Sequence, residues 1–153
     1  MRETLFNWLG QDLSGTCCLD LFAGSGALGF EAASRGAAKV VLVDASPKVV
    51  AALVANARML GAEARVEVLR SDAVRFALHS RQRFDIVFLD PPFHAEWLAR
   101  LAPLVERLLA PDGVLYVEAE QVAGACGAWR TVRSGQAGQV CYHLMRRGET
   151  DGT

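Results

Sequence analysis

Short apolar runs alternate with helical patterns along most of this chain, and this alternation constrains the fold more than any other feature. Five apolar runs predict strands, at 17–22, 40–43, 66–69, 84–89 and 114–117. Helices are predicted between them, at 28–34, 47–60, 72–79 and 97–109. Two weaker strands, at 129–133 and 139–146, predict a terminal hairpin. We therefore expect an α/β fold with a seven-stranded, mostly parallel sheet, a C-terminal antiparallel hairpin and helices on both faces.

The composition fits one globular domain without a membrane span. Of the 153 residues, 52% are hydrophobic and 22% are charged, which suits a folded core. A net charge of −1 provides no overall attraction to nucleic acid, so such a partner would need a local patch. No run approaches the roughly 20 apolar residues that cross a bilayer, and the start does not resemble a signal peptide. The four cysteines form no CxxC pair, so we expect reduced thiols in a cytoplasmic protein.

Residues suited to a ligand follow the first two predicted strands. One is the glycine-rich sequence Gly24-Ser25-Gly26-Ala27-Leu28-Gly29, which permits a tight turn and close backbone approach to a ligand. Asp44 follows the second strand, where a carboxylate can accept both hydroxyls of an adenosine ribose. The glycine pattern alone also fits a nicotinamide dinucleotide. Asp20 favours S-adenosylmethionine instead, because an acid suits the ammonium and sulfonium groups better than a pyrophosphate.

The third strand ends at a further candidate. Asp72 is either a partner for an adenine amino group or the N-cap of the next helix, and Ala73 can supply a backbone N–H. The histidines show no metal-ligand spacing, and we expect no metal. The cofactor is thus expected to contact residues after three strands: Asp20, Phe22, Gly24, Ser25, Gly26, Gly29, Asp44, Asp72 and Ala73.

The fourth strand runs into Asp90-Pro91-Pro92-Phe93, which predicts the chemistry. Two prolines cannot continue a strand ladder, but they form a stiff ledge. Asp90 and a carbonyl of Pro91 or Pro92 can accept both hydrogens of an exocyclic amine, while Phe93 stacks on the base. These four residues are the predicted catalytic set for methyl transfer. Glu118, after the fifth strand, either lines the acceptor pocket or is a solvated strand-end acid.

With these residues assembled, the chain resembles the bacterial methyltransferases that modify the N2 amine of one guanine in small-subunit ribosomal RNA. The resemblance covers nearly the whole chain. It rests on four blocks: Arg2-Glu3-Thr4-Leu5-Phe6-Asn7-Trp8-Leu9, the sequence from Asp20 to Gly29, Asp90-Pro91-Pro92-Phe93, and Gly138-Gln139-Val140. It implies a Rossmann-like class I methyltransferase fold and a monomer that acts on the small subunit or its assembly intermediate. The expected divisions are an N-terminal helix in 1–12, a core in 13–148 and a tail in 149–153.

The sequence departs from this family at its start. Members carry about forty more residues before the Arg2 block, including a basic hairpin whose phosphate contacts would supply much of the RNA affinity. We expect a chain without that basic segment to keep its catalytic core and to bind RNA weakly. Three other functions remain open: an adenine-N6 or other nucleic-acid amino methyltransferase, a dinucleotide-dependent oxidoreductase, and a core that binds cofactor without productive RNA binding.

Overall fold

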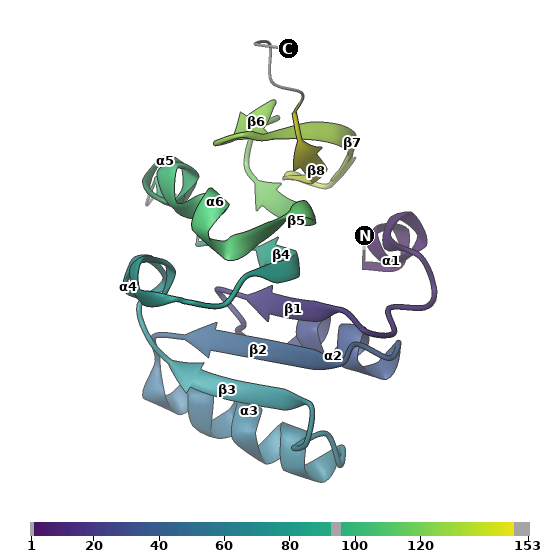
Figure 1. Ribbon diagram of the computed structural model, residues 1–153, viewed down its shortest axis with the longest axis vertical. Coiled ribbons are helices and arrows are strands. Elements are labelled where there is room, and N and C mark those ends of the chain that lie inside the picture. The colour runs from purple at the N-terminus through teal and green to yellow at the C-terminus, as the bar shows by residue number, and fades with distance from the viewer. Residues whose placement is uncertain (1, 93–95, 149–153) are drawn as a thin grey trace.

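A computed structural model describes residues 2–92 and 96–148 of the protein (Figure 1). Eight strands in this part form one sheet in the order β3-β2-β1-β4-β5-β8-β7-β6. The strands are β1 (Cys17–Asp20), β2 (Lys39–Asp44), β3 (Val66–Arg70), β4 (Phe84–Leu89), β5 (Leu109–Ala119), β6 (Ala125–Cys126), β7 (Trp129–Ala137) and β8 (Val140–Arg147). The first five run parallel to one another, and β8, β7 and β6 add antiparallel pairs. The predicted α/β class is confirmed, and the strand beyond the expected seven is the two-residue β6.

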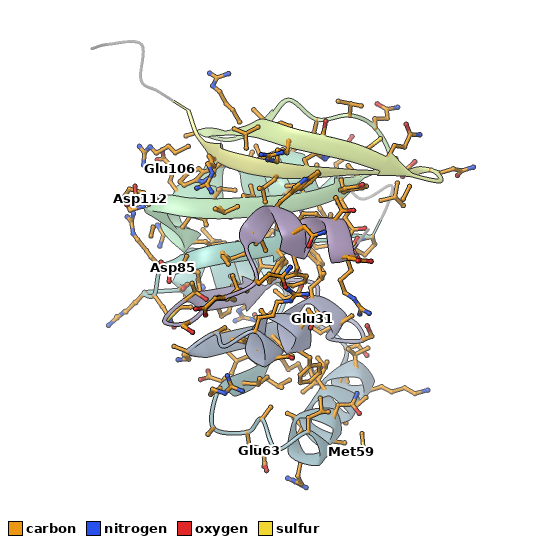
Figure 2. All side chains as sticks on the ribbon, turned by 90° about the vertical axis from the view of Figure 1, so that its right-hand side faces the viewer. Glu31, Met59, Glu63, Asp85, Glu106 and Asp112 are labelled. Atoms are coloured by element: carbon orange, nitrogen blue, oxygen red, sulfur yellow. The ribbon has the colours of Figure 1, made fainter. Side chains whose placement is uncertain are left out.

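Helices cover both faces of the sheet. They are α1 (Arg2–Leu9), α2 (Ala27–Ser34), α3 (Pro47–Met59), α4 (Ala73–His79), α5 (Trp97–Leu101), the 3₁₀ turn η1 (Ala102–Leu104) and α6 (Val105–Leu108). Within the described ranges, none of these helices is long and apolar enough to cross a membrane. On the surface, Glu106 of α6 lies 3.3 Å from Arg147 of β8, a half-exposed ion pair (Figure 2).

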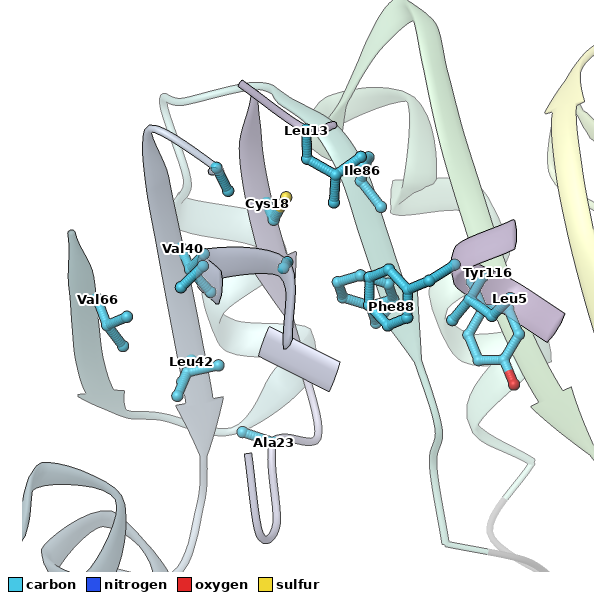
Figure 3. Close-up of a cluster of buried hydrophobic side chains, with 14 of the residues drawn as sticks. Leu5, Leu13, Cys18, Ala23, Val40, Leu42, Val66, Ile86, Phe88 and Tyr116 are labelled. Carbon is cyan, nitrogen blue, oxygen red and sulfur yellow. The ribbon is translucent and has the colours of Figure 1, made fainter. Parts of the chain in front are cut away.

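The parallel strands are apolar on both faces, so the sheet separates two hydrophobic clusters. Cys18 and Phe88 point to the face covered by α1, α2 and α3, while the alternate residue Leu19 points to the face of α4, α5 and α6. Figure 3 shows Leu5 of α1 close to Phe88 and Tyr116 in the first cluster. Each such fully buried large side chain contributes about 1.5–3 kcal/mol to folding.

The capping signals in the sequence locate two helices correctly. The Ser46 hydroxyl accepts the Val49 N–H at 3.3 Å, and Pro47 is the first residue of α3. The Asp72 carboxylate accepts the Arg75 N–H at 3.1 Å and so caps α4. The N-cap interpretation of Asp72 is therefore confirmed.

The predicted helix at 97–109 is wrong in its middle and at its end. Pro103 lies at the start of η1 and breaks the segment into α5, η1 and α6, because proline has no N–H for a continuous helix. The predicted helix extends to 109, but Leu109 already begins β5, and residues 111–113 lie inside that strand, where the β4–β5 pairing shifts between Phe84 and Ile86. A Cβ on Gly113 would come within 2.8 Å of the Ala110 carbonyl oxygen, so this irregularity requires glycine.

The terminal hairpin is longer than predicted. Residues 134–137, expected between the two strands, continue β7, and the turn lies at Gly138 and Gln139. Gly138 has a φ of +60°, which explains why glycine suits this turn. The four cysteines are free thiols, and burial raises the pKa of Cys18 and of Cys126 to about 11.

Candidate active site

The carboxyl ends of β1, β2, β3 and β4 surround a cavity of about 560 Å³. This volume lies within the range of small-molecule sites. The structure brings together here nine of the residues singled out in the sequence: Phe22, Gly24, Ser25, Asp44, Asp72, Ala73, Asp90, Pro91 and Pro92. Leu21, Ala23, Ala45, Ser71 and Trp97 complete the lining. We call this space the cofactor cavity.

The glycine loop forms one wall of the cofactor cavity. Gly24 and Gly26 have φ angles of 53° and 81°, and the Gly26 N–H donates to the Ala23 carbonyl at 2.8 Å, which closes a tight turn before α2. Gly26 and Gly29 lie behind the lining. A Cβ on Gly26 would meet the ring of Phe30, and one on Gly29 would collide with Leu42. These two glycines therefore set the shape of the loop and its packing on β2.

Asp44 ties this loop to the neighbouring strand end. One carboxylate oxygen accepts the Gly24 N–H at 3.1 Å, and the other accepts the Ser46 N–H at 3.0 Å. Since each carboxylate oxygen has two lone pairs, both retain acceptor capacity toward the cavity. Asp72 and Ala73 lie opposite, at the start of α4, where Asp72 both caps the helix and lines the cavity.

A second, smaller cavity of about 350 Å³ opens beside the first, and three acids border it. Asp20, Asp90 and Glu118 come from adjacent strands, and Arg2 of α1 also lines this space. We call it the acidic cavity. It shares Phe22, Ala23, Ser25 and Asp90 with the cofactor cavity, so the two spaces are neighbours.

Asp20 is the most perturbed acid of this group. It is 2% exposed, and desolvation raises its pKa to about 7, with further contributions from Asp90, Glu118 and Asp44. The Phe22 N–H, 3.3 Å from one carboxylate oxygen, opposes this rise only in part. A buried carboxylate among like charges favours a positively charged ligand.

The ledge separates the cofactor cavity from a third space. Pro91 is buried and Pro92 is exposed, and both border the cofactor cavity and another cavity of about 540 Å³. Desolvation raises the pKa of Asp90. Phe93, the fourth predicted catalytic residue, lies outside the described residues.

Two further residues at these cavities carry no local signal that singles them out. Trp97 lines the cavities on both sides of the ledge, its ring 5.1 Å from that of Phe22, with the Arg100 guanidinium 4.1 Å from its centroid. Arg2 reaches the acidic cavity from α1, although it precedes Asp20 by a whole helix and a loop. Its only sequence signal is its place in the first block of the family resemblance.

No group of three or more His, Cys, Asp or Glu side chains is arranged to hold a metal ion in residues 2–92 and 96–148.

Comparisons with known proteins agree with this architecture. The family described as "Conserved hypothetical protein 95" matches residues 1–146. Ribosomal RNA small subunit methyltransferase D of Escherichia coli is 40% identical over 159 aligned positions, covering 99% of this chain and 80% of that protein. A solved structure of Escherichia coli yhhF superposes with a TM-score of 0.88 at 40% identity, covering 97% of this chain and 85% of that one. An RNA methyltransferase of Salinibacter ruber, solved with S-adenosyl-L-homocysteine, shares the fold with a TM-score of 0.77 at 17% identity, covering 99% of this chain and 94% of that one.

The fold and the strand-end cavities define a class I, Rossmann-like methyltransferase. The chain belongs to the conserved hypothetical protein 95 family, which includes small-subunit ribosomal RNA methyltransferases, and the resemblance inferred from its four sequence blocks is confirmed.

Proposed function

We propose that this protein transfers a methyl group from S-adenosylmethionine to the N2 amine of a guanine in small-subunit ribosomal RNA. The observation that carries the proposal is the position of Asp90-Pro91-Pro92. Both prolines border the cofactor cavity on one side and an open cavity on the other, and Asp90 lies where the cofactor cavity meets the acidic cavity. An amine held on the ledge would therefore face a bound cofactor. The names of the relatives support ribosomal RNA as the substrate class.

The residues present fit S-adenosylmethionine. Asp20 is a buried carboxylate whose pKa is raised to about 7, and it gains most from a ligand that carries ammonium and sulfonium charges. Asp44 has acceptor capacity for the ribose hydroxyls, and Asp72 with Ala73 lies where the adenine would be bound. A dinucleotide would instead place pyrophosphate oxygens near Asp20, where like charges repel.

When bound, S-adenosylmethionine supplies a methyl carbon whose bond to sulfur breaks as the bond to nitrogen forms, with the electron pair left on sulfur. Asp90 accepts a hydrogen bond from one N–H of the guanine amine, and a backbone carbonyl of Pro91 or Pro92 accepts a hydrogen bond from the other. Both hydrogen bonds favour a pyramidal nitrogen with its lone pair toward the methyl carbon. Asp90 then takes the proton that the amine loses, and its raised pKa makes it a better proton acceptor. Positioning for in-line attack supplies much of the acceleration.

The direct experiment offers methyl-labelled S-adenosylmethionine to small ribosomal subunits, naked ribosomal RNA, DNA and nucleosides in parallel. The labelled RNA is digested, and the modified nucleoside and its position are identified. We expect label in small-subunit RNA as N2-methylguanosine. Label in N6-methyladenosine would show that the acceptor is an adenine and not a guanine. Cofactor binding in calorimetry without transfer to any RNA would show that the protein is only a cofactor-binding core.

Asp90→Asn separates a catalytic role from a structural one. Asparagine has the same shape but is a much weaker proton acceptor, so turnover should fall at least tenfold while affinity for S-adenosylmethionine stays within about twofold. Asp112→Asn, an exposed acid in β5 away from the cavities, is the matched control and should change neither quantity. Equal loss of binding and turnover in Asp90→Asn would mean that Asp90 is structural.

A further inference from the structure

The cavity beyond the ledge has a wall of its own. It holds about 540 Å³ and is lined by Pro91 and Pro92, by residues 96–99 at the start of α5, and by residues 118–123 at the end of β5 and just beyond it. We call it the acceptor cavity. It lies outside the cofactor site, yet it shares the ledge with it.

Glu118 is the acid that lines the acceptor cavity and lies beside Asp90. Leu89 of β4 pairs with Val117 of β5, so Asp90 and Glu118 follow at adjacent positions on neighbouring parallel strands. Because side chains alternate along a strand, both point to the α1 face, as Phe88 and Tyr116 do. Glu118 is 6% exposed and borders both the acceptor cavity and the acidic cavity.

The Glu118 side chain is held by its surroundings. Desolvation and the nearby Asp90 raise the pKa of Glu118 to about 7. Tyr116, two residues earlier on the same strand, favours the ionised form of the carboxylate and so opposes this rise in pKa. Each carboxylate oxygen has two lone pairs, so Glu118 retains acceptor capacity for a ligand.

The wall that follows Glu118 is fixed by two side chains from the hairpin. His143 is fully buried; its Nε2 accepts the Ala123 N–H at 2.9 Å, so its proton is on Nδ1, which donates to the Val117 carbonyl at 3.1 Å. The Thr131 hydroxyl donates to the Ala123 carbonyl at 2.7 Å. The segment is thus anchored at both ends, which preorganises the cavity for a ligand.

The ring nitrogen beside the amine is a donor in some bases and an acceptor in others, and this difference determines which base suits two neighbouring acceptors. Beside its N2 amine, guanine carries an N1–H donor. The amines of adenine and cytosine are flanked instead by ring nitrogens that are acceptors. When both acids are ionised, the wall matches guanine, because a ring-nitrogen acceptor of adenine or cytosine would then face negative charge.

We propose that Glu118 is the specificity-determining residue of the acceptor cavity, accepting the N1–H of the target guanine while Asp90 accepts a hydrogen of its N2 amine. This inference rests on the proposed function and deepens it, since it explains how this chain distinguishes guanine from other amines. Loss of a hydrogen bond to a charged group corresponds to roughly a tenfold to hundredfold change in kcat/KM.

The test compares two bases that carry the same amine. 2-Aminopurine has the exocyclic amine of guanine but an acceptor at N1. The mapped RNA substrate is prepared by ligation with guanine or 2-aminopurine at the methylated position, and kcat/KM is measured for both. Wild-type protein should prefer guanine at least tenfold. For Glu118→Gln, kcat/KM on guanine should fall at least tenfold, and the ratio of kcat/KM for guanine to that for 2-aminopurine should be below threefold. The reason is that the Gln amide can donate to an N1 acceptor as well as accept from an N1–H.

Two controls separate recognition from folding. Glu118→Gln should bind S-adenosylmethionine within twofold of wild type, and Glu67→Gln, an exposed acid of β3 away from the cavities, should retain the full preference. A Glu118→Gln variant that still prefers guanine tenfold would overturn the assignment of Glu118, as would a wild type that accepts 2-aminopurine equally well. Both results leave guanine-N2 methylation standing. A methyl label mapped to an amine other than guanine N2 would refute both the proposed function and this inference.

Discussion

Replacing Asp20 by asparagine should stabilise the folded protein at pH 8. Burial raises the pKa of Asp20 from 3.8 to about 7. Because the pKa is higher in the folded state than in the unfolded chain, the ionised form is disfavoured on folding. The free energy of unfolding therefore falls as pH rises from about 4 to about 7 and stays low above that. A shift of this size corresponds to about 4 kcal/mol at pH 8.

Asparagine removes this cost while keeping the shape of the side chain and the oxygen that accepts the Phe22 N–H. The variant should thus be more stable than wild type by about 4 kcal/mol at pH 8, and by less than about 1 kcal/mol at pH 4, where both chains carry a neutral side chain. In thermal unfolding, the difference at pH 8 corresponds to a rise in Tm of roughly 10 °C.

The measurement is urea unfolding of both proteins without cofactor at pH 4, 6 and 8 and constant ionic strength. The m-value should stay the same, so that midpoints report stability alone. Equal stability at pH 8 would refute the account of Asp20 as a strained buried carboxylate. A stability difference that does not change with pH would refute it as well, since it would point to packing rather than to ionisation.

Three other outcomes follow from the cofactor cavity and its loop. Wild-type affinity for S-adenosylmethionine should fall about fivefold from pH 7 to pH 6 in calorimetry, because protonated Asp20 no longer balances the ligand's charge, and Asp20→Asn should show no such fall. Asp44→Ala should weaken the affinity for S-adenosylmethionine more than tenfold, since it removes the predicted ribose acceptor and the partner of the Gly24 N–H. An unchanged Kd would refute the assignment of Asp44 to the ribose. Gly29→Ala should cost about 1–3 kcal/mol in urea unfolding, because the new methyl group collides with Leu42, and a neutral result would mean that this contact relaxes freely.

Much of the parallel half of the fold could be predicted because its signals are local. The apolar run that forms β4 has the predicted bounds, Phe84–Leu89, and Ser46 with Pro47 starts α3 as expected. The segment after the ledge differs from the prediction for two reasons. Pro103 breaks the helix locally, because it has no N–H for a continuous helix, whereas Gly113 lies within β5 because the pairing with β4 accommodates it there.

The candidate site likewise contains residues whose positions could be predicted from the sequence and residues whose positions could not. Asp20 and Asp44 end strands, and Asp72 and Asp90 come shortly after strands. Because the carboxyl ends of parallel strands share one edge, the convergence of these acids was predictable. The contribution of Arg2 was not, because α1 reaches the acids through packing over the sheet. The burial that perturbs Asp20 and Glu118 likewise depends on neighbouring strands, and no local pattern encodes it.

The strand order also has a consequence for how such a protein can diverge. β1, β2 and β3 come from the first 70 residues and end at the cofactor cavity, whereas the acceptor cavity is lined by the end of β5, the segment that follows it and the start of α5. The cofactor cavity and the acceptor cavity thus rest largely on different parts of the chain, and among their described lining residues they share only Pro91, Pro92 and Trp97. Changes in residues 119–123, which line the acceptor cavity and neither of the other two, can alter that cavity without altering the lining of the cofactor cavity. A lineage built on this plan can exchange its substrates while its methyl donor stays the same.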